Sequence, residues 1–183
     1  MAGFSVIGYF SVKTEWKNYI SRDEAMQLVN EVKSADELPY AFYELFEIKY
    51  PNSLHNNFSK QFFKGVLGES NIEVPSYLVA SNSKLQYKIQ NKKGLVSFIW
   101  FIEENTSQKE CLNYYVSKFD YMYNSKGIAQ ASKYYFNKDA HDLNKNEIAT
   151  FIIMLENPYY YNPKKHKERL AKKVKKMLSS NKN

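Results

Sequence analysis

Paired acidic side chains are the first candidates for chemistry in this sequence. Glu44 and Glu47 are three residues apart in a segment with helical apolar spacing, and Glu103 and Glu104 follow a long apolar run. Two carboxylates can divide the work of a general acid and a general base. Acids three apart on a helix are also common on an ordinary solvated face, so both interpretations stay open at this point.

The residue types give little support for metal binding or for a glycine-rich phosphate-binding loop. His55, His141 and His166 are isolated from one another, and Cys111 is the only cysteine. A zinc site built on several cysteines is therefore excluded, and the sequence contains no glycine-rich phosphate loop. We expect neither a metal nor a cofactor.

The positive charge is concentrated near the end of the chain. The 183 residues have a net charge of +7, with 26 Lys and Arg against 19 Asp and Glu. Residues 164–183 contain nine of these bases and one acid, Glu168, for a net +8, so the remainder is close to −1. The apolar spacing of residues 164–178 predicts a basic amphipathic helix. Such a helix either rests on anionic lipid or packs into the core with lysines outside.

Nucleic-acid binding is an alternative suggested by the pI of 9.2 and the many lysines and tyrosines. Only two arginines, Arg22 and Arg169, are present. Arginine is the preferred planar reader of phosphates and bases. We therefore keep a basic nucleic-acid-binding module as a second alternative only, and expect no nucleic-acid partner.

Length and periodicity predict a mainly α protein with a single helical domain over residues 1–183. No run approaches the roughly 18 apolar residues of a membrane-spanning helix; the segment 4–12 is too short and reads as a strand or a trimmed remnant. Residues 51–82 are predicted to be loop with one short helix around 58–66. The other predicted helices cover 21–33 with a capping box at Ser21 and Glu24, 37–50, 86–104, 109–119, 127–135, 144–155 capped by Asn144, and 166–178.

The C-terminal third contains a recognisable series of motifs. They are Gly127-Ile-Ala-Gln-Ala131, Tyr134-Tyr-Phe-Asn-Lys138, Glu147-Ile-Ala149 and Asn157-Pro158 followed by Tyr161-Asn162-Pro163. This series resembles the C-terminal half of glycosyltransferase family 51, the peptidoglycan glycosyltransferase (transglycosylase) domain of penicillin-binding proteins. The resemblance implies a lysozyme-like fold and a lipid II substrate, and implies that these motif residues mostly build the fold.

The same resemblance implies two catalytic acids, and this sequence departs from the pattern at both. Leu38-Pro39 and Tyr50 align with the first motif, which places Phe46 at the catalytic Glu and Glu47 at the next position. Sliding the alignment by one residue gives Glu47 the catalytic place but loses both correspondences. The second acid falls on Leu95, or on Asn91 in an alternative register.

Substrate-binding positions also follow from the resemblance. A motif that contacts substrate in the family falls near Ser76 and Asn82, and Lys88 and Lys92 lie where a diphosphate would bind. Ammonium groups can hold phosphate as point charges, although lysines at a helix end are also commonly just solvated. His55 is expected to be a surface residue.

The sequence therefore suggests a degenerate transglycosylase-like domain, a pseudoenzyme that binds or scaffolds in peptidoglycan biosynthesis. Lipid II or a glycan strand, a membrane surface and cell-wall synthesis proteins are the expected partners. The expected location is the outer face of the cytoplasmic membrane, with any anchor absent from this chain. The rival hypothesis is a divergent active enzyme using Glu47 with Glu103 or Glu104, so whether the chain is an enzyme stays open.

Overall fold

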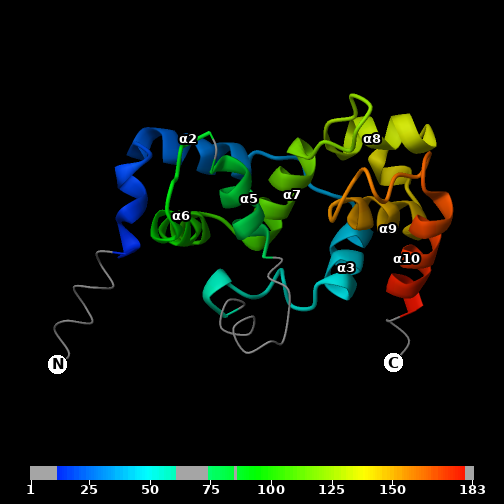
Figure 1. The fold of residues 1–183 in the computed structure, drawn as a ribbon, viewed down its shortest axis with the longest axis horizontal. Helices are drawn as coiled ribbons and strands as arrows, with labels where there is room; N and C mark the ends of the chain where they lie inside the picture. Colours follow the sequence, from blue (N-terminus) through cyan, green and yellow to red (C-terminus); the bar gives the residue numbers. More distant parts are fainter. Residues whose placement is uncertain (1–11, 61–73, 85, 180–183) are drawn as a thin grey trace. The chain divides into compact units, whose positions relative to one another are not determined.

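The computed structural model describes residues 12–60, 74–84 and 86–179 (Figure 1). Helices joined by short connections make up most of these residues. No strand occurs in the described ranges, where the β-type pairing found is an isolated bridge between Asp120 and Lys126. The predicted mainly α fold is confirmed.

Contacts divide the chain into two compact units. The first unit combines Met1–Ala35 with Ser53–Tyr114, and the second combines Asp36–Asn52 with Tyr115–Asn183. The segment 36–52 therefore belongs with the C-terminal residues although it is encoded early in the chain. The domain organisation predicted for residues 1–183 stays a prediction.

Several helical elements in the described part of the first unit have defined bounds. They are η1 (Glu15–Asn18), α2 (Arg22–Lys33), α5 (Pro75–Ser83), α6 (Lys92–Asn105) and the start of α7 (Gln108–Lys118). The predicted capping box is present, because Ser21 Oγ accepts a hydrogen bond from Glu24 N and Glu24 Oε2 accepts one from Ser21 N. Phe98, Ile99 and Ile102 of α6 are fully buried.

Two predictions about this unit were wrong. Helix α5 occupies part of the segment predicted to be loop, and Pro75 begins it; proline fits the first helical turn, where its missing N–H has no partner to lose. Helix α6 begins at Lys92, six residues later than predicted, because Lys88 has φ +52° and Asn91 caps the helix by accepting from Gly94 N at 2.7 Å.

Two other expectations fall largely outside the described residues. The segment 4–12 is described only at its last residue, and the short helix expected around 58–66 only at 58–60, which are helical.

The second unit is built around α9 (Lys145–Met154), of which residues 148–154 are all buried. Helix α9 packs against α3 (Tyr40–Lys49) and against α10 (Lys167–Ser179) (Figure 1). The unit also contains α8 (Gly127–Phe136) and η2 (Ala140–Asp142). The carboxylate of Glu156 links α3 to α10, since it pairs with Lys49 at 2.6 Å and Lys173 at 3.3 Å.

The predicted basic amphipathic helix is α10. Its apolar residues Leu170, Val174 and Met177 are buried, whereas most of its lysines are exposed. The helix thus uses this apolar face for packing within its own unit. Across the described residues, no helix combines the length and apolar character needed to cross a membrane.

Candidate functional site

The two positions at which the resemblance expects catalytic acids hold apolar side chains in different units. Phe46 lies on α3 in the second unit, has 0% exposure and packs its ring 4.9 Å from that of Tyr50. Leu95 lies in the first turn of α6 in the first unit and is half-buried. Neither side chain can accept or donate a proton.

The acids that could replace them have different surroundings. Glu47 follows Phe46 on α3 and is half-buried, while Glu44 is exposed on the same helix. Glu104 is exposed and pairs with Lys13 at 2.5 Å. Glu103, one residue earlier on α6, accepts three hydrogen bonds.

Glu103 joins three segments of the first unit through a single oxygen atom. Its Oε1 accepts hydrogen bonds from the backbone N of Phe58 at 2.7 Å, from Ser76 Oγ at 2.8 Å and from Gln108 Nε2 at 2.8 Å. Gln108 also accepts from Ser76 N at 2.9 Å and donates to Ser76 Oγ at 3.1 Å. The carboxylate thereby connects the end of α6 to Phe58, to the start of α5 and to the start of α7.

Burial raises the pKa of Glu103 above its ordinary value, and the hydrogen bonds from Phe58, Ser76 and Gln108 oppose that rise. A raised pKa is one property of a proton-transferring carboxyl group. Here Oε1 already accepts hydrogen bonds from three donors, an arrangement typical of a carboxylate that holds neighbouring segments together. Local sequence patterns could not reveal it, because the donors lie 45, 27 and 5 residues away.

The predicted substrate-binding residues are all in the first unit. Ser76 is fully buried and belongs to the Glu103 cluster, whereas Asn82 is exposed on α5. Lys88 is exposed and lines a hollow of about 420 Å³ shared with residues such as Tyr19 and Tyr87. Lys92 is exposed in the first turn of α6. Their roles toward a substrate stay predictions.

The start of α6 combines positive charge with tight packing. Lys92 and Lys93 occupy its first turn and no acid does, so they add to the positive end of the helix dipole. The neighbouring Gly94 lies against Tyr19, since a Cβ at this position would be 2.6 Å from Tyr19 Cε2. The positive charge is thus fixed on a closely packed helix end.

His55 is exposed, as predicted, and the described residues contain no group of three or more His, Cys, Asp or Glu able to hold a metal ion.

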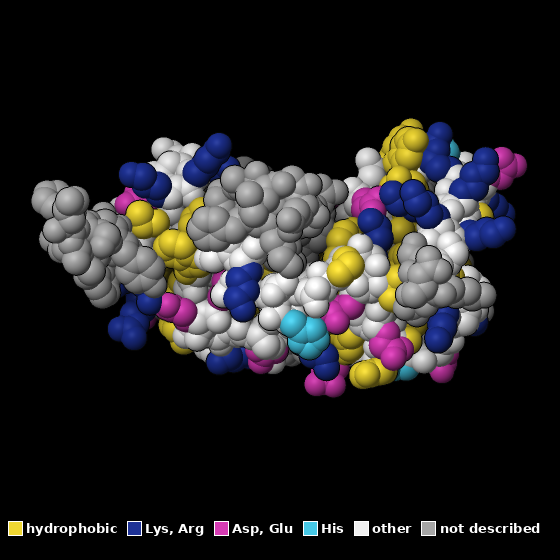
Figure 2. Space-filling view, turned by 90° about the horizontal axis from the view of Figure 1, so that it is seen from below, with side chains coloured by type: hydrophobic (Ala, Val, Ile, Leu, Met, Phe, Trp, Pro, Cys, Tyr) yellow, Lys and Arg dark blue, Asp and Glu magenta, His cyan; other side chains and the backbone are white. Residues whose placement is uncertain are grey.

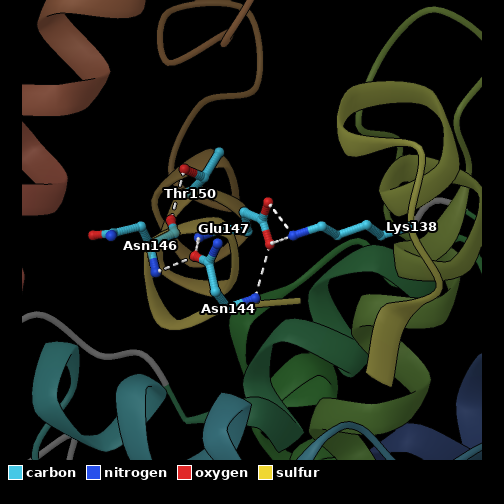
Figure 3. A network of polar contacts seen from close by, with 5 residues as sticks. All are labelled: Lys138, Asn144, Asn146, Glu147 and Thr150. Carbon is cyan, nitrogen blue, oxygen red and sulfur yellow. Dashed lines mark hydrogen bonds and ion pairs between the residues drawn. The ribbon is translucent and has the colours of Figure 1, made fainter. Parts of the chain in front are cut away.

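In the second unit, the motif residues contact one another. Lys138 Nζ pairs with both carboxylate oxygens of Glu147, at 2.8 and 3.0 Å (Figure 3). Glu147 also accepts from Asn144 N at 2.8 Å, and Asn144 Oδ1 accepts from the backbone N of Asn146 and of Glu147. This is the predicted cap of α9, and it fixes Glu147 for its contact with Lys138.

A second set of contacts joins α8 to the segment before α10. The fully buried Asn162 donates to Tyr135 OH at 3.1 Å and accepts from Lys164 N at 2.9 Å, and Tyr135 in turn donates to the carbonyl of Tyr121 at 2.7 Å. Burial raises the pKa of Tyr135 to about 12, so the phenol stays a donor at neutral pH. These motif residues hold the unit together.

Gly127 supplies a backbone conformation that this unit needs. Its φ is +75°, and an added Cβ would lie 2.5 Å from the carbonyl oxygen of Ser117. Glycine adopts this conformation without steric cost. The first residue of the first motif is thus explained by the close approach of α8 to the end of α7.

These features define a helical domain organised by the motif residues. A family model described as Transglycosylase matches residues 75–182, more than half of the chain, and the chain belongs to this family.

Similar curated proteins have related names. The chain is 28% identical over 174 residues to "Penicillin-binding protein 1A/1B" of Bacillus subtilis, which covers 92% of this chain and 18% of that protein. It is 34% identical over 114 residues to "Biosynthetic peptidoglycan transglycosylase" of Haemophilus influenzae strain PittEE, covering 61% and 46%. A second H. influenzae protein of that name, from strain KW20, is 35% identical over 105 residues, covering 56% and 41%. The chain thus matches less than half the length of each.

Proposed function

We propose that this transglycosylase-type domain has lost glycosyl transfer and acts as a binding or scaffolding element in peptidoglycan synthesis. Its ligand is lipid II or a growing glycan strand, and it works at the outer face of the cytoplasmic membrane beside cell-wall synthesis proteins. The observation that carries the proposal is Phe46, a fully buried phenyl ring at the position expected for the first catalytic acid.

The chemical argument concerns the proton of the acceptor sugar. In the reaction implied by the resemblance, a carboxylate removes that proton as the hydroxyl attacks the donor sugar. A single general base contributes about 10² to 10⁴-fold in rate. Phe46 and Leu95 supply no such group, so the domain lacks both acids at their expected positions.

The cations beside Leu95 support retained binding. Lys88 and Lys92 are exposed, and Lys92 and Lys93 share the first turn of α6. Backbone N–H groups at a helix start attract anions, and nearby ammonium groups strengthen that attraction. A diphosphate such as that of lipid II fits this chemistry without requiring any catalytic acid.

The rival proposal is a divergent active enzyme in which Glu47 is the base. Its half-buried place next to Phe46 on α3 favours it. The acids proposed to act with Glu47 favour the rival proposal less. Glu103 Oε1 already accepts hydrogen bonds from three donors, and Glu104 pairs with Lys13. The two proposals differ in a measurable product.

The test is incubation of the purified chain with fluorescent lipid II, with glycan chains separated on a gel and binding measured by thermophoresis. We expect binding and no chains, and a fall in affinity of about tenfold when Lys88 and Lys92 are both changed to Ala. Glycan chains that disappear in Glu47→Gln would establish the rival. Absence of lipid II and glycan binding would refute the scaffolding role. An active transglycosylase is the positive control.

A further inference from the structure

A groove of about 840 Å³ runs along α10 in the second unit. Its walls come from α10, the end of α8, the first half of α9 and the segment just before α10, and much of its lining is hydrocarbon. The apolar lining residues are Tyr135, Phe136, Pro163, Leu170, Ala171, Val174 and Leu178. Ala171 is exposed and Leu178 is half-buried, so the groove presents apolar surface in addition to the face that α10 buries.

The charged residues of the groove are all positive. Lys164, Lys167 and Lys175 line it and are exposed, and no acidic residue is among its described lining residues. Figure 2 shows that lysine and arginine side chains gather over the part of the molecule that carries α8 and α10, on the right of the view, next to hydrophobic side chains. An occupant must therefore be both apolar and anionic.

The arrangement of these residues gives the groove a length. Its lining positions on α10 recur every three or four residues from Lys167 to Ser179, so they form one face of the helix. At 1.5 Å per residue, the groove follows α10 for roughly 18 Å, and Lys167 and Lys175 lie about 12 Å apart along it. The cations therefore line the side of the groove instead of closing one end.

We propose that this groove binds an acidic amphipathic helix of a partner protein. The partner's apolar face covers the exposed Ala171 and the half-buried Leu178, and carboxylates seven or eight residues apart meet Lys167 and Lys175. This is a helix-in-groove mode of recognition, with electrostatic complementarity along its length.

The charge spacing favours this occupant over an anionic lipid. A lipid with one headgroup concentrates its charge at one end, which would leave Lys167 or Lys175 beside an acyl chain without an anion. A second copy docking through α10 would bring lysines against lysines. The groove uses none of Phe46, Leu95, Lys88 and Lys92, so the inference goes beyond the proposed function and does not depend on it.

The experiment measures binding of a fluorescent helical peptide of about 15 residues by anisotropy. The peptide has leucines at helical spacing on one face and glutamates seven residues apart on both sides of that face. We expect a Kd on the order of 10 μM, weakening as salt rises. A version with lysines in place of the glutamates should not bind.

Matched variants of the full chain locate the binding. Ala171→Trp fills the groove and the double change Lys167→Glu, Lys175→Glu reverses its charge, and each should weaken binding at least about tenfold. Lys172→Glu reverses one charge on α10 outside the groove, half the charge change of the double variant, and should alter affinity less than about twofold. Circular dichroism checks that every variant is folded.

Three outcomes would overturn the inference. They are no saturable peptide binding below about 1 mM, binding that Lys172→Glu weakens as much as the groove variants do, and binding of anionic phosphatidylglycerol vesicles that is lost in Ala171→Trp while the peptide does not bind. None of these measurements uses lipid II, so failure here is distinguishable from failure of the proposed function.

Discussion

Asn162 and Phe46 lie in the same unit and are both fully buried, yet their chemistry is opposite. Asn162 is a motif residue that keeps polar partners, Tyr135 OH and Lys164 N. Phe46 is at an expected acid position and packs as hydrocarbon against Tyr50. The contrast shows that one family member can keep the motif residues that build the fold while it lacks the acids at the positions expected to perform the reaction.

The largest expected effect concerns Phe46. Changing Phe46→Glu places a charge where the side chain has 0% exposure, and such a charge lacks compensation. The free energy of unfolding should fall by more than about 3 kcal/mol, measured by urea denaturation.

Tyr40→Glu is the matched control, because Tyr40 is on the same helix and 72% exposed. It should change stability by less than about 0.5 kcal/mol. Near-normal stability of Phe46→Glu would mean that the position is accessible to water, as in a catalytic site. It would refute the description of Phe46 as a buried apolar counterpart of Asn162.

An intermediate effect is expected at Asn162. Asn162→Ala leaves the part-buried N–H of Lys164 without its acceptor and Tyr135 OH without a donor, which should cost about 2 kcal/mol. Tyr135→Phe should cost about 1 kcal/mol. Thermal and urea unfolding of both single variants and the double variant measure the coupling.

If the two residues act as a pair, the double variant should lose less than the sum of the single losses, by at least about 0.5 kcal/mol. Strict additivity would mean that the Asn162–Tyr135 contact contributes little, and that this motif residue is retained for another reason.

The smallest effect is a pH dependence at Glu103, a half-buried acid of the first unit. Because burial raises its folded-state pKa, the folded chain binds the proton more tightly than the unfolded chain does. Stability due to this group is therefore present below the ordinary pKa of 4.5 and is lost as pH rises through the raised value. Glu103→Gln keeps an oxygen acceptor and should flatten this part of the stability profile.

Urea unfolding from acidic to neutral pH measures the profile, with Glu104→Gln as the control for an exposed acid one residue away. A profile unchanged by Glu103→Gln would show that the carboxyl titrates normally. Loss of lipid II polymerisation in the same variant, were the chain active, would make Glu103 catalytic instead of structural.

Local patterns in the sequence predicted much of the helical framework. The capping box at Ser21 and the cap at Asn144 are confirmed, because in each case the partners lie three residues apart. Helix α5 lies mostly in the segment predicted to be loop, since proline commonly ends helices but also fits the first turn of one, as Pro75 does here.

The contacts that join distant segments could not be predicted in the same way. Glu103 meets Ser76 across 27 residues and Asn162 meets Tyr135 across 27, and no periodicity encodes such pairs. The resemblance indicated the positions of Phe46 and Leu95. Only the structure shows that Phe46 is fully buried in a core and that Leu95 is half-buried.

The early position of α3 in the chain bears on how the protein can be cut and synthesised. Helix α3 packs on α9, about 100 residues later in the sequence. During translation α3 leaves the ribosome long before α9 is synthesised. The apolar side chains of α3 therefore stay exposed until then, unless a chaperone or another segment covers them. A fragment limited to residues 75–182, the span that defines family membership, would lack α3 and expose the face of α9 that α3 covers. Such a fragment should aggregate. Because it also lacks η1, which packs against α6, adding a separate peptide of residues 36–52 should restore its solubility only in part.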